Sequence, residues 1–435
     1  MRIKDHLDKI SWSFADKAVM IAFGLFLFVQ LRFIEVEQYA FYLLLIVLNN
    51  WIFAIADGFA LQGVIQFGGK PSQKARVNFM ALSMLIGISL GAAFLFFALR
   101  FSIADFFSQP AYGEALAFLP LTVIATIPKN FIIKTLYRDF RYNKIFWVNL
   151  SYFSSQVIFS LYYIFETGCL DAQKMINIFI VGGLVSALVA IISVSRTLKI
   201  SKKGDISFKE FLGFGMNISV QYIFQSSSRN LDFYIVEYFF GLGVGGVYGA
   251  AKQMFRSFEE ASYAAHGLVY PAAVKLITND DKEGLRSLLS KSISAMMIMF
   301  VVIAIILNLG LTDFVLNLFK IEKFYSAVGH FNFLVIGGLF LPLLLINPVL
   351  NAMKKHTSVL FIIIISSLAS MVILAIISYF GQVNYIAGGM VSYYLILGIL
   401  SFTIVRKEIG LGIKDLFRGF GDGYNFIKSI ITKNK

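Results

Sequence analysis

The chain has 435 residues, of which 58% are apolar and only 14% are charged, and its mean hydropathy is +0.76. A soluble domain cannot bury that much apolar surface, so the composition excludes a soluble protein. The net charge of +13 would favour nucleic-acid binding in a soluble protein. Here the cations lie mostly between long apolar runs, and we expect no nucleic-acid partner.

Twelve apolar runs, each of roughly 20 residues, are long enough to cross a bilayer as helices. In chain order they cover 12–33, 41–66, 78–101, 115–137, 145–165, 175–195, 210–232, 246–271, 290–309, 327–351, 357–380 and 384–405. A transmembrane β-barrel would show shorter segments of alternating polarity. The sequence therefore predicts an all-α integral membrane protein with about twelve transmembrane helices.

The positions of Lys and Arg test this count, because short cytoplasmic loops are richer in these residues than the opposite loops. Of the 38 cations, 28 fall in alternate connections and at the two ends of the chain. These basic segments are the N-terminal segment, 67–77, 134–144, 196–209, 275–291, 354–355 and 406–435. The opposite connections hold five cations and also acids such as Glu237. We expect a multi-pass protein with both termini in the cytoplasm.

Internal similarity divides the apolar runs into two sets of six. Phe-Leu-Pro-Leu occurs in the fourth run of each set, at 118–121 and 340–343, and a second proline follows at Pro128 and Pro348. Paired prolines predict kinked helices, which commonly flank a cavity in transporters. The predicted divisions are an N-terminal six-helix bundle (1–200), a C-terminal six-helix bundle (201–405) and a basic amphipathic cytoplasmic tail (406–435).

Five cations remain inside the apolar runs. They are Lys17, Lys129, Arg229, Lys252 and Arg256. Each would cost roughly 2.5–3.5 kcal/mol at the membrane centre unless it faces water, an acid or an anionic ligand. We therefore predict that these five side chains bind an anionic head group, and a phosphate group suits lysine and arginine best.

The eighth run concentrates charged and polar side chains on one face. On a helix, Lys252, Arg256, Glu259 and His266 fall within a stripe of about 80°, and Glu260 lies just outside it. One interpretation is a ladder of buried ion pairs, because Arg256 can pair with either glutamate. The favoured interpretation is a cavity wall, since the stripe continues along the whole run.

Two buried acids leave alternatives open. Asp57 in the second run and Asp232 in the seventh either pair with buried cations or titrate as sites of H⁺ or Na⁺ coupling. His266 is either a proton carrier or a hydrogen-bonding group. Cys169 is the only cysteine, and the sequence shows no metal-ligand cluster, P-loop or nucleophile constellation. We predict a transporter rather than an enzyme, with no cofactor beyond a coupling ion.

The sequence resembles the O-antigen (Wzx-type) polysaccharide flippases of the multidrug, oligosaccharidyl-lipid and polysaccharide exporter superfamily. The resemblance covers nearly the full chain. It is carried by KDHLDKISWSFADKAVMIAFGLFLFVQLRF, EVEQYAFYLLLIVLNNWIFAIADGF and LDFYIVEYFFGLGVGGVYGAAKQM, followed by Pro271. Ala40 departs from the glycine that the family usually has at that position.

This resemblance implies two pseudo-symmetric six-helix bundles around a central cavity that opens alternately to the cytoplasm and the periplasm. The implied substrate is an undecaprenyl-pyrophosphate-linked oligosaccharide, an O-antigen or other surface polysaccharide unit, as in lipopolysaccharide synthesis. The implied location is the bacterial inner membrane, with a polysaccharide polymerase and glycosyltransferases as partners. A lateral opening between the first and eighth spans would bring Lys17, Lys252 and Arg256 near the pyrophosphate.

Three rival functions remain. A drug or cation antiporter of the same superfamily would favour an acidic cavity, which five buried cations oppose. A membrane polysaccharide polymerase or ligase would need a long periplasmic loop, and no outward connection is long. A receptor or scaffold would not need a charged stripe within the membrane.

Overall fold

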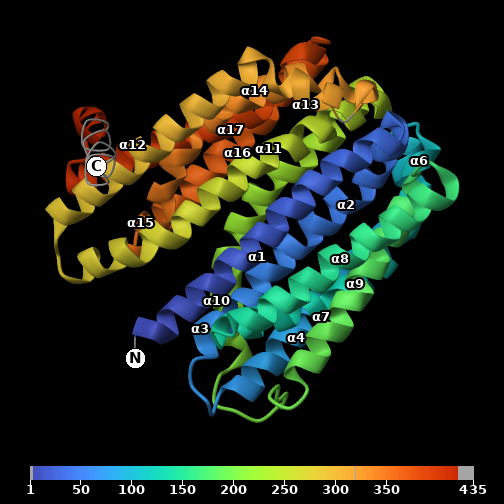
Figure 1. Cartoon of the computed structure of the whole chain (residues 1–435). Coiled ribbons are helices and arrows are strands. Elements are labelled where there is room, and N and C mark those ends of the chain that lie inside the picture. The colour runs from blue at the N-terminus through green and yellow to red at the C-terminus, as the bar shows by residue number, and fades with distance from the viewer. Residues whose placement is uncertain (1–2, 319, 420–435) are drawn as a thin grey trace. The chain divides into compact units, whose positions relative to one another are not determined.

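The computed structural model describes residues 3–318 and 320–419, without the side chains of 3–10, 217, 264–268, 271 and 315. These residues form helices joined by short connections, and their one extended pairing is a bridge between Ile34 and Leu170 (Figure 1). The predicted all-α fold is confirmed.

Two compact units make up the chain, Met1–Gly249 and Ala250–Lys435. The first contains α1 (Ile3–Gln30), η1 (Leu31–Phe33), α2 (Val36–Ala56), η2 (Asp57–Leu61), α3 (Gln62–Phe67), α4 (Lys74–Ala98), α5 (Arg100–Phe106), α6 (Pro110–Ala117), α7 (Leu119–Arg138), α8 (Tyr142–Thr167), α9 (Ala172–Val194), α10 (Phe208–Ser226), η3 (Ser227–Leu231) and the start of α11 (Asp232–Thr278). The second continues α11 and adds α12 (Lys282–Ile306), η4 (Leu307–Leu311), α13 (Thr312–Leu318), η5 (Glu322–Phe324), α14 (Ala327–Gly338), η6 (Leu341–Leu345), α15 (Ile346–Ala352), α16 (His356–Tyr379), η7 (Val383–Tyr385) and α17 (Gly388–Ile409).

All twelve predicted spans fall on helix in the described residues. By length and composition, nine helical runs there can cross a membrane, or ten when the bent pair of α14 and the 341–352 segment counts as one span. One run of 56 residues, Phe208–Tyr263, covers the seventh predicted span and most of the eighth, and non-helical backbone at Gly241 divides it into two helices. Helix α8 has 26 residues, about 39 Å, and is long enough to span despite its polar side chains.

Large apolar side chains remain on the surface of these helices. Phe165 is 85% exposed, Leu309 81% and Ile192 72%. A soluble protein does not expose so many large apolar groups, and lipid is the environment that matches them. The described helices therefore form a multi-pass membrane protein.

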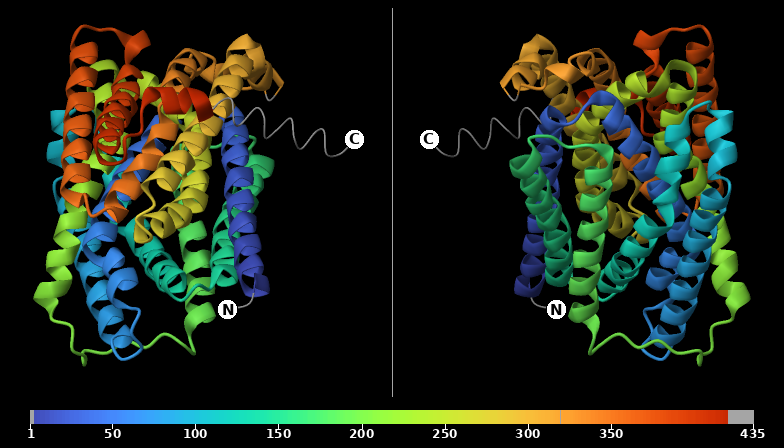
Figure 2. Two further views of the ribbon diagram at one scale, coloured as in Figure 1. Left: turned by 90° about the vertical axis from the view of Figure 1, so that its left-hand side faces the viewer. Right: turned by 90° about the vertical axis from the view of Figure 1, so that its right-hand side faces the viewer.

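The basic connections of the first unit gather at one end of its helices. Figures 1 and 2 show the connections 68–73 and 195–207 side by side there. Arg76 Nη1 donates to the carbonyl oxygen of Lys202 at 2.7 Å, and Lys74 Nζ lies 2.8 Å from Asp139 Oδ1. At the other end, the amide of Leu170 bonds the carbonyl oxygen of Phe33 at 2.7 Å. The predicted alternation of connections between two ends thus holds in this unit.

Small residues let α10 approach α2 and its continuation closely. A Cβ added at Gly58 would lie 2.6 Å from Ser219 Cα, and one at Gly215 would lie 2.4 Å from the carbonyl oxygen of Phe59. A Cβ at Gly63 would meet the ring of Phe211. Close backbone approach through small residues is a common packing mode of membrane helices. The first unit therefore extends beyond residue 200, where the predicted bundles were divided, and the six-plus-six division stays a prediction.

The start of the predicted tail is anchored on the second unit. Helix α17 continues to Ile409, past the predicted start of the tail at 406, and Asp415 then pairs with Arg286 of α12 at 2.6 Å. Ser294 Oγ donates to the carbonyl oxygen of Leu416 at 2.7 Å. Residues 420–435 lie outside the described residues.

We expect acid to release this anchor. A backbone hydrogen bond from Gly412, with further bonds from Arg286, lowers the pKa of Asp415 below its ordinary value of 3.8. A lowered pKa in the folded state stabilises the anchor above pH 3.8, and this contribution disappears as the pH falls through the lowered value. The protection of the 411–419 amides from hydrogen exchange, relative to the intrinsic exchange rate at each pH, should therefore fall at low pH. Arg286→Met should show fast exchange already at neutral pH, and identical profiles for both proteins would contradict the assignment.

Candidate functional site

A lysine packed on aromatic rings lies in the helical core of the first unit. Lys129 follows Pro128 in α7, and its Nζ lies 3.2 Å from the ring centroid of Tyr152 and 5.8 Å from that of Phe153, both in α8. An ammonium over an aromatic face is attracted by the negative face of the ring. This contact holds a cation within the membrane without neutralising its charge.

A second predicted cation belongs to the same neighbourhood. Asp16 in α1 is only 6% exposed, accepts a hydrogen bond from Asn149 Nδ2 at 2.8 Å, and interacts electrostatically with Lys17 and Lys129. Lys17 is half-buried, and its Nζ lies 3.9 Å from Met20 Sδ. We call Asp16, Lys17, Lys129 and Tyr152 the Lys129 cluster. It carries two cations and one carboxylate, so its formal charge is positive.

Asp57 pairs with a lysine that the sequence had assigned to a loop. Its Oδ1 lies 2.8 Å from Lys134 Nζ, which belongs to α7, and its Oδ2 accepts a bond from Gln62 Nε2 at 2.6 Å. Gln62 Nε2 also lies 3.0 Å from Tyr222 Oη of α10. Asp57 thus pairs with a half-buried lysine, and its alternative role as a titrating site stays a prediction.

Two π-helical segments position other predicted residues. Asp57 opens η2, and Arg229 is half-buried in η3, next to Asp232 at the start of α11. Single π-turns inside helices are frequent at functional sites. Asp232 is 2% exposed and accepts a hydrogen bond from Tyr248 Oη at 2.6 Å. These residues lie in the first unit.

The charged stripe of the eighth predicted span is not uniform in the second unit. Glu259 is 6% exposed and accepts a hydrogen bond from Tyr394 Oη, whereas Arg256 is exposed. Lys252 and Glu260 are half-buried. The stripe thus contains a buried acid and an exposed cation rather than one continuous surface. The predicted role of His266 is not tested, because its side chain lies outside the described residues.

Sequence reasoning missed a buried carboxyl at the other end of the first unit. Glu237, expected in an outward loop, lies in α11 and is only 5% exposed. Tyr112 Oη donates to its Oε2 at 2.6 Å. The expectation of a loop was wrong because the helix continues to the break at Gly241. Neither Glu237 nor Lys134 carries a sequence signal that separates it from a loop residue.

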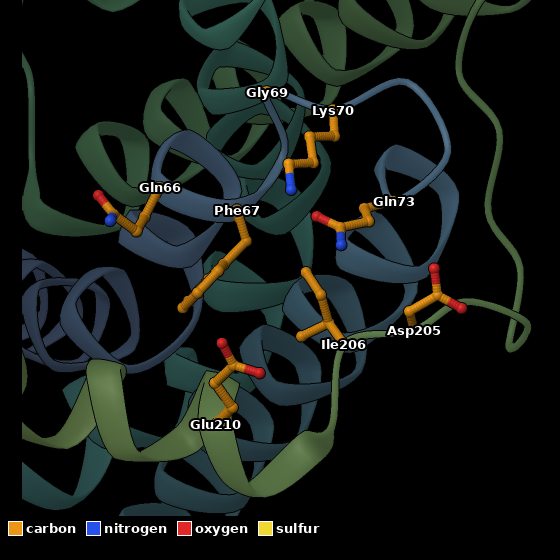
Figure 3. Close-up of a pocket in the computed structure, with 8 residues that line it drawn as sticks. All are labelled: Gln66, Phe67, Gly69, Lys70, Gln73, Asp205, Ile206 and Glu210. Carbon is orange, nitrogen blue, oxygen red and sulfur yellow. The ribbon is translucent and has the colours of Figure 1, made fainter.

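Cavities open at both ends of the first unit. At the basic end a cavity of about 320 Å³ lies between the 68–73 connection and the start of α10, where Lys70, Gln73 and Glu210 face one another (Figure 3). Its lysine is offset by two acids, Asp205 and Glu210, so it is a weaker anion site than the Lys129 cluster. A larger cavity of about 740 Å³ lies between α5 and α6. No group of three metal-ligating side chains occurs among the described residues.

Comparison with protein families matches residues 31–328 to the family described as Polysaccharide biosynthesis protein, which is well over half of the chain. The chain belongs to this family. A search of the curated proteins gives no significant match.

Solved structures share the fold of this polysaccharide biosynthesis protein at low sequence identity. A multidrug resistance MATE family transporter of the MOP superfamily, in its inward-facing conformation, aligns with a TM-score of 0.74 and 13% identity, over 92% of this chain and 94% of that one. The lipid II flippase MurJ, in an inward closed conformation, aligns with a TM-score of 0.67 and 16% identity, over 98% and 93%. A MOP superfamily transporter from Pyrococcus furiosus aligns at 0.57 and 13%, over 97% and 92%.

The family match confirms the predicted polysaccharide family, and the solved structures confirm that the chain has the fold of this exporter superfamily. The solved structures that share the fold are described as a multidrug resistance transporter and a lipid II flippase. The structural matches cover 92% and 98% of the chain. The family match begins at residue 31, so it includes Lys129 and Tyr152 but not Asp16 and Lys17 of α1.

Proposed function

We propose that the protein is a flippase that moves an undecaprenyl-pyrophosphate-linked oligosaccharide from the inner to the outer leaflet of the bacterial inner membrane. The oligosaccharide is an O-antigen or another surface polysaccharide unit. Its charged head passes between the helices by alternating access, while the lipid tail stays in the bilayer. The membership of the polysaccharide biosynthesis family and the fold shared with a lipid II flippase support this proposal.

The observation that carries the proposal is the position of Lys129. A lysine within apolar helices is energetically costly unless its ammonium group faces water, an acid or an anionic ligand. Here an aromatic ring orients Nζ without cancelling its charge. A pyrophosphate carries several negative oxygens and suits such a cation. Lys17 and Lys129 both interact with Asp16, so the cluster would hold one phosphate while this carboxylate fixes the position of the lysines. Arg229, Lys252 and Arg256 stay candidates for further head-group contacts.

The same proposal implies an orientation in the membrane, partner enzymes and an energy source. The basic end of the helices faces the cytoplasm, where lysine and arginine gather in short loops, and both termini lie on that side. Glycosyltransferases would supply the substrate there, and a polymerase would take it on the outer face. The transport cycle would use a proton or sodium gradient, with Asp57, Asp232, Glu259, Glu260 and His266 as candidate coupling or charge-pairing residues and no other cofactor.

A drug or cation antiporter is the second candidate, since a MATE transporter shares the fold with a TM-score of 0.74. The sign of charge in the binding pocket distinguishes the two. The Pyrococcus furiosus transporter is itself described by a reverse polarity of its binding pocket that suggests a different function. In this chain the Lys129 cluster is positive, which favours an anionic substrate.

Purified protein in proteoliposomes tests the proposal. The vesicles contain an undecaprenyl-pyrophosphate oligosaccharide with a fluorescent sugar, and a membrane-impermeant quencher reports how much reaches the outer leaflet. We expect quenching to exceed that of protein-free vesicles, and a matched lipid-linked sugar without phosphate to stay protected. Export of a cationic dye without movement of the lipid-linked sugar would overturn the proposal in favour of the antiporter.

A further inference from the structure

An unpartnered oxygen lies within the first unit at Glu237. This side chain is 5% exposed, and its Oε1 is buried without a hydrogen-bond partner, while Oε2 accepts the bond from Tyr112. A carboxylate in such a place would be strongly destabilised, because one of its charged oxygens is shielded from bulk solvent and has no donor among the described residues. A protonated carboxyl avoids this cost.

The groups around Glu237 do not supply a compensating charge. Its titratable neighbours are Tyr112 of α6 and Tyr234 of α11, and Tyr234 donates its own hydrogen bond to the carbonyl oxygen of Leu44 in α2. No lysine, arginine or histidine among the described residues forms an ion pair with this carboxyl. Phe107 stacks on Tyr112 with ring centroids 4.1 Å apart and covers that side. A metal cation would need several oxygen ligands, whereas a proton needs only one.

Glu237 also lies against the interruption of α11. Gly241 has φ 81° and ψ 174°, a backbone conformation that essentially only glycine adopts. A Cβ at Gly245, beyond the break, would lie 2.6 Å from Glu237 Cγ and 3.2 Å from its Oε1. The unpartnered oxygen therefore faces the helix segment that follows the break. Tyr248 and Asp232 join the two sides of the same break through their hydrogen bond.

The segment after the break is held against α2. A Cβ at Gly246 would lie 2.3 Å from the carbonyl oxygen of Val36. A charge on Glu237 would draw water toward Gly245 and push this packed segment away, whereas a neutral carboxyl lets it stay. The segment after Gly241 therefore packs on Glu237 at one residue and on α2 at the next.

We propose that Glu237 is a proton-binding site, and that binding and release of its proton change the break in α11 at Gly241. This inference rests on the proposed function only in giving the proton a role in transport. The proton would favour the conformation described here, and its release would favour one in which the 242–249 segment moves away from Glu237.

Infrared spectroscopy of the purified protein tests the site without any substrate, so its result is independent of the flippase proposal. A protonated buried carboxyl gives a carbonyl band that shifts in heavy water and disappears when the proton leaves. We expect such a band at neutral pH in the wild type, its loss in Glu237→Gln, and its retention in Glu114→Gln, which alters an exposed glutamate of α6. A band unchanged in Glu237→Gln, or a spectrum that responds to sodium instead of pH, would overturn the proposal.

A second variant covers the case in which Glu237→Gln does not fold. Tyr112→Phe removes the donor that favours the charged carboxylate, so the band should persist to a pH about one unit higher than in the wild type.

In vesicles with the lipid-linked sugar, Glu237→Gln should transport at a rate that no longer changes when a pH gradient is imposed. Persistence of the wild-type gradient response in that variant would also contradict the proposal.

Discussion

Replacing Lys129 with alanine is expected to lower the flipping rate about 10- to 100-fold. The variant loses a charge-assisted contact with the pyrophosphate, which contributes roughly 1.5–3 kcal/mol. The fold should survive, since the substitution removes a costly charge from an apolar setting. The measurement is the initial rate of quenching in proteoliposomes with the lipid-linked oligosaccharide, at matched amounts of reconstituted protein.

Matched variants separate charge from position. Lys129→Arg keeps the cation and should retain much of the rate, whereas Tyr152→Leu removes the ring that orients Nζ and should lower it. Tyr152→Phe keeps a ring face and should transport nearly normally. Lys70→Ala removes an exposed cation at the basic end and is the control. Equal rates in Lys129→Ala and Lys70→Ala would contradict the assignment of the Lys129 cluster.

The second large effect concerns stability. Asp57→Ala should destabilise the protein by about 2–4 kcal/mol, because it leaves Lys134 partly buried without its carboxylate partner. The pair keeps some contact with its surroundings, since the side chains are 17% and 22% exposed, which places the effect below that of a fully buried pair. The thermal midpoint of purified protein in detergent measures the loss.

A double variant identifies the cause. Asp57→Ala together with Lys134→Met removes both charges, and we expect it to be more stable than Asp57→Ala alone. If instead the two substitutions destabilise the protein additively, the side chains do not interact energetically. That result would favour the other interpretation of Asp57, a titrating site.

The membrane fold could be predicted because its signals are long. Each span depends on some 20 apolar residues, so single polar residues do not obscure it, and the basic loops give an independent check. The ends of the spans were harder to predict where a glycine breaks a helix. Gly241 leaves the helix in the left-handed region, but Gly243, Gly245 and Gly246 stand beside it in the sequence, and only the folded backbone distinguishes them.

The candidate site was harder to predict because it depends on partners. Lys129 could be selected from its cost within a span, but Tyr152 could not, since the chain has 20 tyrosines and 46 phenylalanines. Lys134 lies near the end of a helix and counted as a loop cation. Its pairing with Asp57 joins residues 77 positions apart, and sequence periodicity contains no information on such contacts.

The close packing of α10 on α2 has a consequence for biosynthesis. During translation the first six predicted spans leave the ribosome before α10, so the surface around Gly58 and Gly63 initially lacks Ser219 and Phe211. Until then that surface must be covered by lipid, by the insertion machinery or by a loosely associated helix. The first six spans thus enter the membrane before the first unit can pack completely, and the seventh span completes that packing.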